Sequence, residues 1–220
     1  MPRAASRPLL RRSCQTLDPT RMATALPTSP IHGVRTVELT SEHGAKLQVF
    51  FDANPQYFLA VNGEPAGLAE AHEEIHGEPP AGWSFTKKWL VGYVNSGSAI
   101  VAMANVTSDL LAFGVWHIGF FIVATERHGS GDAQALYRGL ESWACTNGAN
   151  WLRIGVVQGN SRAERFWESL GYIQTRTRGG VEMGKLTNTL RVMVKSLAGG
   201  TVEQYLALVE RDRPEPRNGI

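Results

Sequence analysis

The sequence of 220 residues contains few cysteines, no strong excess of either charge and no long apolar run. Its two cysteines, Cys14 and Cys145, lie in very different sequence contexts, so we expect no disulfide framework and a reducing compartment, the cytoplasm. No apolar stretch approaches the length of about 20 residues that a membrane-spanning helix requires, and we expect no membrane association. The net charge of +2 gives no indication of nucleic-acid binding, because proteins of that kind usually concentrate Lys and Arg on one face.

What the sequence does contain is typical of a globular protein, with 43% hydrophobic and 19% charged residues. A chain of this length can form one core that removes roughly 70% of its unfolded surface from water. It is too short for two ordinary domains and a tail. We therefore expect one domain at residues 31–197, preceded by a separate segment at 1–30 and followed by a helix and tail at 198–220. A homodimer is compatible with this organisation.

Residues 1–21 are rich in arginine and contain a single acid, Asp18. The apolar pair Leu9-Leu10 is followed at once by Arg11-Arg12, so we do not expect a secretory signal. An organelle transit peptide has a composition of this kind. The simpler interpretation, which we favour, is a disordered tail or a start upstream of the true one at Met22.

Hydrophobic periodicity changes along the chain. Before residue 77 the apolar spacing predicts helices, and from residue 89 β-branched and aromatic runs between Gly, Asn and Ser predict strands. A strand–helix–strand–helix–strand order follows, which predicts an α+β fold whose antiparallel sheet contains a crossover. The expected helices are 46–52, 67–75, 132–147, 160–170 and one within 198–211, and the expected strands are 34–39, 89–94, 98–105, 116–123, 151–157 and 190–195.

A glycine-rich turn, His128-Gly129-Ser130-Gly131-Asp132-Ala133, joins the strand at 116–123 to the next helix. Glycines allow a ligand to approach the backbone closely. The free N–H groups and the dipole of a helix start favour an anion such as a diphosphate. The spacing and the preceding strands differ from the Rossmann and Walker patterns, and a Gly-x-Gly turn alone is weak support for any function.

About thirty residues later, a second motif begins at Asn160 and ends at Gly171-Tyr172. Asn160 can cap the following helix and still offer its side-chain amide to a ligand. Phe166 and Trp167 offer an apolar wall, and the chain then leads back into the sheet. The second motif makes the pattern specific.

The two motifs together resemble the GNAT superfamily of acetyl-CoA-dependent N-acetyltransferases, over about residues 34–197. The family's Arg/Gln-x-x-Gly-x-Gly/Ala signature is similar to residues 128–133. Its Asn-x-x-Ala…Tyr…Gly-Phe signature is similar to Asn160, Ala163, Trp167 and Gly171-Tyr172. His128 replaces the first Arg or Gln, and Trp167 stands where many members have a Tyr that acts as general acid. The resemblance implies a mixed, mostly antiparallel sheet with helices on both faces. It also implies transfer of acetyl from acetyl-CoA to a primary amine, of a small molecule or a protein, by direct attack in a ternary complex.

The resemblance further implies where acetyl-CoA would bind. Its pantetheine arm would pair with a strand edge as an added strand does, and its diphosphate would rest on the N–H groups of the glycine turn. Arg162 and Arg165 either contact the 3′-phosphate of CoA or lie on a solvated helix face. The residues expected to bind acetyl-CoA are Phe121, Ile122, Val123, His128, Gly129, Ser130, Gly131, Asp132, Ala133, Asn160, Phe166 and Trp167.

The acceptor amine must lose a proton before it attacks the thioester, which requires a base or a chain of water molecules. By the resemblance, His117 lies where the family often places a carboxylate base, and an imidazole titrates near neutral pH. Alternatively, His117 is a half-buried strand residue bonded to a neighbour. Because Trp167 cannot donate a proton as a phenol does, the leaving thiolate would be protonated by water or by a hydroxyl, with Tyr137 and Tyr172 nearby in sequence. His117 and Tyr172 are the catalytic residues that we predict.

The segment His72-Glu73-Glu74-Ile75-His76 matches the zinc-protease motif His-Glu-x-x-His. The third position of that motif is usually uncharged, the helix stops at Gly77, and no third ligand follows at a recognisable spacing. We therefore expect no metal and favour a solvated helix whose acids attract a cationic amine. A zinc hydrolase is one alternative function. The other is a non-catalytic acyl-CoA-binding module, in which Trp167 marks a lost acid.

The acceptor side is expected to be built by the first helices and by a loop around Gly179. The aromatic pairs Phe50-Phe51 and Tyr57-Phe58 could line it, although such pairs are more often core. Arg176, Arg178 and Lys185 lie in a Gly-rich stretch that we expect to be a solvated hairpin loop.

Overall fold

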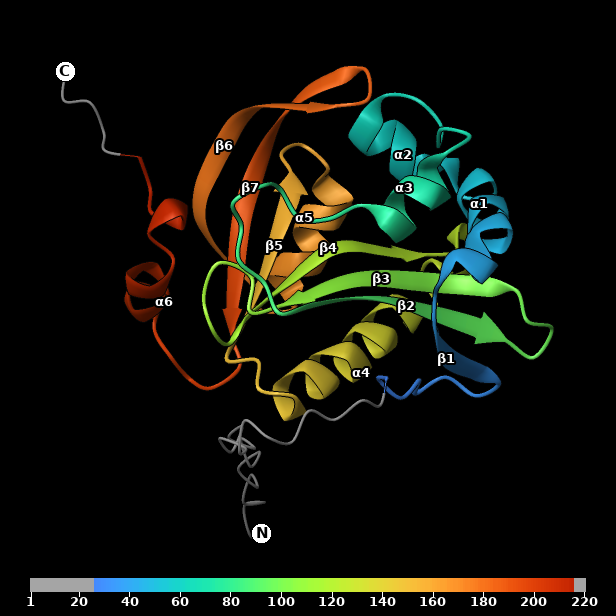
Figure 1. The fold of residues 1–220 in the computed structure, drawn as a ribbon, viewed down its shortest axis with the longest axis horizontal. Coiled ribbons are helices and arrows are strands. Elements are labelled where there is room, and N and C mark those ends of the chain that lie inside the picture. The colour runs from blue at the N-terminus through green and yellow to red at the C-terminus, as the bar shows by residue number, and fades with distance from the viewer. Residues whose placement is uncertain (1–25, 216–220) are drawn as a thin grey trace, which may run out of the picture.

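The computed structural model describes residues 26–215, and a single seven-stranded sheet runs through them (Figure 1). Only the pair β4–β5 is parallel, and all other neighbouring strands are antiparallel. The predicted mixed, mostly antiparallel sheet is therefore confirmed. In spatial order the strands are β1 (Val34–Glu38), β2 (Lys87–Asn95), β3 (Ile100–Ser108), β4 (Val115–Val123), β5 (Trp151–Val157), β7 (Leu186–Ser196) and β6 (Ile173–Met183).

Helices cover both faces of this sheet, as the sequence predicts. On one face α1 (Gly44–Asp52), α2 (Pro55–Asn62) and α3 (Glu70–His76) pack on β2 to β4 around a core that includes Phe51 and Met103. On the other face α4 (Asp132–Thr146) and α5 (Ser161–Ser169) pack on the larger core. The helix α2 was not among the predicted helices, because its eight residues form only two turns.

The helix α4 forms where the hydrophobic spacing predicts it. Its buried side chains follow a helical period and therefore make one stripe against the sheet. Gly148, in the left-handed region at φ +96°, lies just beyond its C-terminus. The buried residues of the stripe are Leu136, Tyr137, Leu140, Trp143 and Ala144.

The segment expected to be a hairpin loop is mostly strand. β6 spans eleven residues and pairs with β7 along the edge of the sheet, so Arg176 and Arg178 lie in a strand, and only Lys185 lies in the turn. Most of its side chains are exposed, and a strand without a buried face lacks the alternation that identifies strands in sequence. The tip of this hairpin reaches α2, where Lys185 N–H donates to Asn62 O at 2.8 Å and Asn188 Nδ2 donates to Val61 O at 2.8 Å (Figure 1).

The C-terminal segment is part of the fold. The predicted helix within 198–211 is shorter, α6 (Val202–Leu208), and the 3-10 turn η3 (Glu210–Asp212) follows it. Asp212 is 1% exposed and accepts hydrogen bonds from Arg153 at 2.7 and 2.9 Å and from the Tyr205 hydroxyl at 2.5 Å. This buried ion pair ties the segment to β5. Moving the segment away would leave the Arg153 charge buried without its partner, which is strongly destabilising.

Some expectations concern residues outside the described range. The predicted tail, transit peptide or upstream start at residues 1–21 lies entirely outside the described residues. Cys145 is not a free thiol in the structure. The other cysteine, Cys14, lies outside the described residues, so the expectation of no disulfide framework stays a prediction. Within residues 26–215, no helix has both the length and the apolar character needed to cross a membrane. The compartment, the homodimer and the absence of nucleic-acid binding stay predictions.

Candidate active site

The strands β4 and β5 separate in the middle of the sheet. Their parallel pairing runs from Val115–Trp151 to Ile118–Ile154 and then stops, whereas β4 stays paired to β3 as far as Val123. The next residues, Gly119 and Gly155, are both exposed although the strands around them are mostly buried. We call the space between the two unpaired strand edges the β4–β5 opening; solvent reaches the sheet there through both glycines.

A β-bulge marks the start of the opening. Asn105 of β3 pairs with Phe120 and Val106 pairs with Ile118, so Gly119 is an extra residue in β4. Because of this extra residue, the alternation of side chains between the two faces of the sheet shifts by one position along β4. Ile118 and Phe121 both belong to the face of α4, and Phe120 belongs to the face of α1 to α3. Isolated glycines inside strand patterns, at Gly119 and Gly155, were the sequence signal for this feature, and the sequence prediction did not use it.

The glycine turn lies between the end of β4 and the start of α4, as predicted. Gly129 and Gly131 have φ values of +84° and +89°, and a Cβ at either position would meet nothing within 4 Å. Gly131 is the N-cap of α4 and brings no side chain to the first-turn N–H groups. The Ser130 hydroxyl accepts from Asp132 N–H at 3.2 Å. The other first-turn N–H groups have no acceptor within the helix, and such free donors at a helix start favour an anion.

The side chains of His128 and Arg127 bond to other groups of the protein and do not project over the exposed backbone of the glycine turn. His128 Nε2 donates to Val123 O at 2.8 Å, and its backbone N–H donates to Thr125 O at 3.1 Å. The side chain of His128 therefore holds the turn to the end of β4. Its expected contact with acetyl-CoA stays a prediction. Arg127 pairs with Asp132 at 2.8 Å, which offsets a carboxylate at the helix start.

The second motif lines the opposite side of the β4–β5 opening. Asn160 Oδ1 accepts from Ala163 N–H at 3.2 Å, which confirms the predicted cap and leaves the Nδ2 group available. The ring of Phe166 stacks on that of Phe121 at 6.1 Å, and Trp167 packs edge-on against both. These rings form a continuous aromatic wall between β4 and α5. Ile122 and Val123 are buried, so they offer a ligand only their backbone.

The structure places Tyr172 in the core. Its side chain is 4% exposed, lies edge-on to Trp167 at 5.2 Å, and accepts a hydrogen bond from the Tyr137 hydroxyl at 3.2 Å. Burial raises the pKa of Tyr172, so its hydroxyl keeps its proton. The role of Tyr172 as general acid stays a prediction.

His117 lies at the opening, but its environment differs from the expected one. Its Nδ1–H donates to Arg153 O at 3.0 Å, and the Arg153 guanidinium lies 3.5 Å from the same nitrogen. Burial, followed by the charge of Arg153, lowers the pKa of His117 to about 3. The expectation that this imidazole titrates near neutral pH is therefore wrong, because the protein holds it neutral.

A carboxylate that the sequence prediction assigned to a solvated helix faces the sheet instead. Glu74 of α3 is half-buried, and its Oε1 accepts from Asn105 Nδ2 at 2.6 Å. Asn105 is a lone polar residue in an otherwise apolar stretch of β3, which is the signal that could have identified it. Burial raises the pKa of Glu74, and the bond from Asn105 and the charge of Lys88 only partly oppose this rise.

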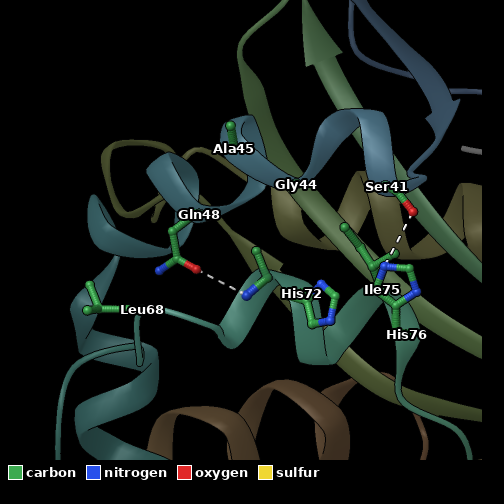
Figure 2. Close-up of a pocket in the computed structure, with 9 residues that line it drawn as sticks. Ser41, Gly44, Ala45, Gln48, Leu68, His72, Ile75 and His76 are labelled. Atoms are coloured by element: carbon green, nitrogen blue, oxygen red, sulfur yellow. Dashed lines mark hydrogen bonds between the residues drawn. The ribbon is translucent and has the colours of Figure 1, made fainter.

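The two histidines of the zinc-protease motif, His72 and His76, lie on the side of α3 that faces α1 (Figure 2). They border a pocket of about 240 Å³ between α1 and α3, where His76 Nε2 lies 3.3 Å from Ser41 Oγ and the rings of His72 and His76 are 4.4 Å apart. Catalytic zinc usually takes three protein ligands. Within the described part of the chain, no group of three or more His, Cys, Asp or Glu side chains is placed to hold a metal. The zinc hydrolase therefore gains no support, and the absence of a metal stays a prediction.

The remaining candidates divide between core and surface. Phe50, Phe51 and Phe58 are buried, as the structural interpretation predicts, whereas Tyr57 is partly exposed with its ring 4.5 Å from that of Phe120. Arg162 and Arg165 are exposed on α5. Their contact with a 3′-phosphate stays a prediction.

Comparisons with known proteins agree with this arrangement. A family model described as Acetyltransferase (GNAT) family matches residues 28–172, more than half of the chain. The fold is similar to a ribosomal-protein-S5-alanine acetyltransferase from Vibrio fischeri, with a TM-score of 0.60, 10% identity and coverage of 78% of this chain and 97% of that chain. It is also similar to a spermidine N-acetyltransferase from Vibrio cholerae in complex with CoA and spermine, with a TM-score of 0.58, 11% identity and coverage of 76% of this chain and 98% of that chain. For an acetyltransferase from Thermus thermophilus, the TM-score is 0.55, the identity is 17%, and the coverage is 74% of this chain and 96% of that chain.

At such identities the structural likeness shows the fold alone. No curated protein sequence matches the chain. The family model carries the assignment, and it covers both the glycine turn and the Asn160 motif, which line one opening in the sheet. The chain therefore belongs to the GNAT family and is an acetyl-CoA-dependent N-acetyltransferase.

Proposed function

We propose that this protein transfers acetyl from acetyl-CoA to a primary amine by direct attack within a ternary complex. The observation that carries the proposal is the position of the β4–β5 opening relative to the glycine turn. The unpaired edge of β4 leads from Gly119, at the bulge, to the glycine turn at the N-terminus of α4. A long thioester with a diphosphate at one end matches this combination of features.

In this proposal acetyl-CoA is held mainly by backbone. Its pantetheine amides pair with the free edge of β4 at Phe121 to Val123, and its diphosphate accepts hydrogen bonds from the free backbone N–H groups of residues 129–133. The aromatic wall of Phe121, Phe166 and Trp167 covers the apolar part of the arm. Asn160 offers its Nδ2 group from the opposite side. His128 contributes by holding the turn in place.

The chemistry requires a neutral amine and a stabilised oxyanion. When the amine nitrogen attacks the thioester carbonyl carbon, negative charge develops on the carbonyl oxygen. The extra residue of a bulge leaves the strand ladder locally unpaired, so the backbone at Gly119 supplies an N–H group for that oxygen. Collapse of the tetrahedral intermediate expels the CoA sulfur, which leaves as the thiol once it has gained a proton.

The acceptor is proposed only as a primary amine. Spermidine and a ribosomal-protein alanine, named for two of the similar structures, both present primary amines. In this chain the acceptor side is bordered by α2 and α3, and the tip of the β6–β7 hairpin contacts α2. A thiol-release assay with acetyl-CoA and a panel of spermidine, an alanine-initiated peptide and a lysine-containing peptide tests the proposal. We expect thiol release that requires the amine, with the N-acetylated versions of the same compounds as unreactive controls.

The rival is a protein that binds acyl-CoA without transfer. Trp167 in place of a phenol, and the buried position of Tyr172, favour this candidate. Tight CoA binding in calorimetry, together with no thiol release for any amine of the panel, would select it. Release of thiol with one amine alone is enough to exclude it.

A further inference from the structure

The side chain of Glu74 points from α3 into the sheet. Residues two positions apart on a helix project in nearly opposite directions, so Glu74 faces away from His72 and His76, which border the outer pocket. The hydrogen bond from Asn105 Nδ2 at 2.6 Å fixes this direction, because Asn105 lies in β3 on the sheet face that α3 covers. Of the two neighbouring acids on α3, Glu73 is exposed and Glu74 is half-buried.

Asn105 brings a second acceptor to the same place. Since its Nδ2 group donates to the Glu74 carboxylate, its Oδ1 atom, on the same amide, is left as a nearby acceptor. This oxygen is buried and has no hydrogen-bond partner among the described residues. A buried acceptor without a donor is costly. Beside a carboxylate, such an acceptor suits a ligand with several N–H donors and a positive charge.

These two groups lie at the bulge where β4 and β5 separate. A Cβ built on Gly119 would lie 3.8 Å from the side-chain amide of Asn105 and 3.8 Å from the ring of His117. Asn105 is paired with Phe120, the residue that follows the bulge. Glu74 is therefore one hydrogen-bonded side chain away from the point at which the proposed reaction takes place.

The charges around Glu74 leave a site for a cation. Lys88 of β2 donates to the backbone oxygens of Glu74 and Gly77 at 2.6 and 2.5 Å, so it holds the end of α3 and forms no ion pair with the carboxylate. Glu70, one turn earlier on α3, adds a second negative charge. From α2, Tyr57 faces both acids and its pKa is raised by burial and by their charges, so it stays neutral. His117 on β4 is neutral as well.

We propose that Glu74 binds the ammonium group of the acceptor at the Gly119 bulge, with Asn105 Oδ1 as its second acceptor, and serves as the general base. This inference rests on the proposed function. Glu74 takes one proton from the ammonium, and the freed lone pair forms the C–N bond. The carbonyl π electrons move to oxygen and return as the C–S bond breaks. The sulfur takes the second proton of the nitrogen, directly or through water, and leaves as CoA thiol. The protonated Glu74 then releases its proton to solvent.

The physical properties of Glu74 suit this role better than those of His117. Burial raises the pKa of Glu74 toward the working range of a base, whereas burial and Arg153 lower the pKa of His117 far below it. The proposal also implies a substrate class. The acceptor is a cationic primary amine, because a neutral amide or hydroxyl brings no positive charge to the neighbouring carboxylates of Glu74 and Glu70.

The closing experiment compares E74Q with E73Q in the full-length protein, and uses E74D as the conservative variant. E74Q keeps an acceptor for Asn105 Nδ2 but removes the charge and the basic site, and E73Q removes an exposed acid of the same helix. We expect E74Q to lower kcat/KM for the amine about 10²- to 10⁴-fold, which is the usual contribution of general acid–base catalysis. We expect it to lose the rising limb of the pH profile that reports the carboxylate. E74D should keep that limb, and E73Q should match the wild type.

Calorimetry with CoA and a thermal melt accompany each variant, so that a loss of folding is separated from a loss of chemistry. If the wild type acetylates an amine and E74Q does so equally well, with the same pH profile, the assignment of Glu74 is overturned and the proposed function stands. If the wild type binds CoA but acetylates no amine of the panel, both fall together. A loss in E74Q with CoA affinity intact supports the assignment.

Discussion

The two sides of the β4–β5 opening are built in different ways. On the cofactor side, two continuous segments contribute: the turn at residues 128–133 presents backbone groups, and the start of α5 presents the Asn160 side chain. On the acceptor side, Glu74, Asn105 and Gly119 come from three elements, and each contributes one group. The cofactor side therefore depends on local conformation, which a short motif can specify. The acceptor side depends on side chains that only the folded sheet brings together.

The largest effect that we expect on the cofactor side comes from Gly131→Asp. The new side chain would occupy the open space over the turn, in a residue with φ +89°, and its carboxylate would repel a diphosphate. We expect the Kd for CoA, measured by calorimetry, to rise by about 100-fold, because a buried or crowded like charge commonly costs several kcal/mol.

Gly148→Asp is the matched control for that variant. Gly148 lies beyond the other end of α4, has φ +96°, and likewise has nothing within 4 Å of a built Cβ. Both variants should lose about 1–2 kcal/mol of unfolding free energy, because an L-residue in the left-handed region is strained, but only Gly131→Asp should lose affinity for CoA. Equal Kd values for the two variants would mean that the turn does not bind the diphosphate.

The same difference explains what could be predicted from the sequence. The fold class, α4 with its apolar stripe, the glycine turn and the Asn160 cap all follow from patterns within about fifteen residues. β6 was missed because an edge strand with most side chains exposed has no alternating pattern. Glu74 was assigned to solvent because its partner, Asn105, is 31 positions away in sequence. His117 lies on the predicted strand, but its pKa is lowered first by burial and then by the charge of Arg153, and both arise only in the folded chain.

The next effect concerns His117 and the stability of the fold. Its pKa is about 3 in the folded protein, below the ordinary value of 6.5, so the unfolded chain binds a proton at a higher pH than the folded chain does. Stability from this group is therefore present above pH 6.5 and is lost as pH falls from about 6.5 toward 3, by up to about 1.4 kcal/mol per pH unit. His117→Gln should flatten the decline in unfolding free energy between pH 7 and pH 5, as measured by urea titration.

His72→Gln, which changes an exposed imidazole, is the control and should leave that decline in place. If His117→Gln and the wild type decline equally, the folded protein protonates His117 near neutral pH. The imidazole would then regain its candidacy as the base, and the acceptor side would contain two competing groups.

The smallest effect tests whether a charged side chain of the glycine turn matters for CoA binding. Arg127 offsets the charge of Asp132 at the start of α4 through a partly exposed ion pair of 2.8 Å. Arg127→Gln leaves that carboxylate beside the proposed diphosphate, and we expect the Kd for CoA to rise by about fivefold, equivalent to roughly 1 kcal/mol for a partly exposed charge. Adding Asp132→Asn should restore the affinity, and raising the salt concentration should shrink the difference. A loss as large as that of Gly131→Asp, or no recovery in the double variant, would mean that the Arg127 side chain binds the anion directly. The cofactor side would then depend on a side chain as the acceptor side does.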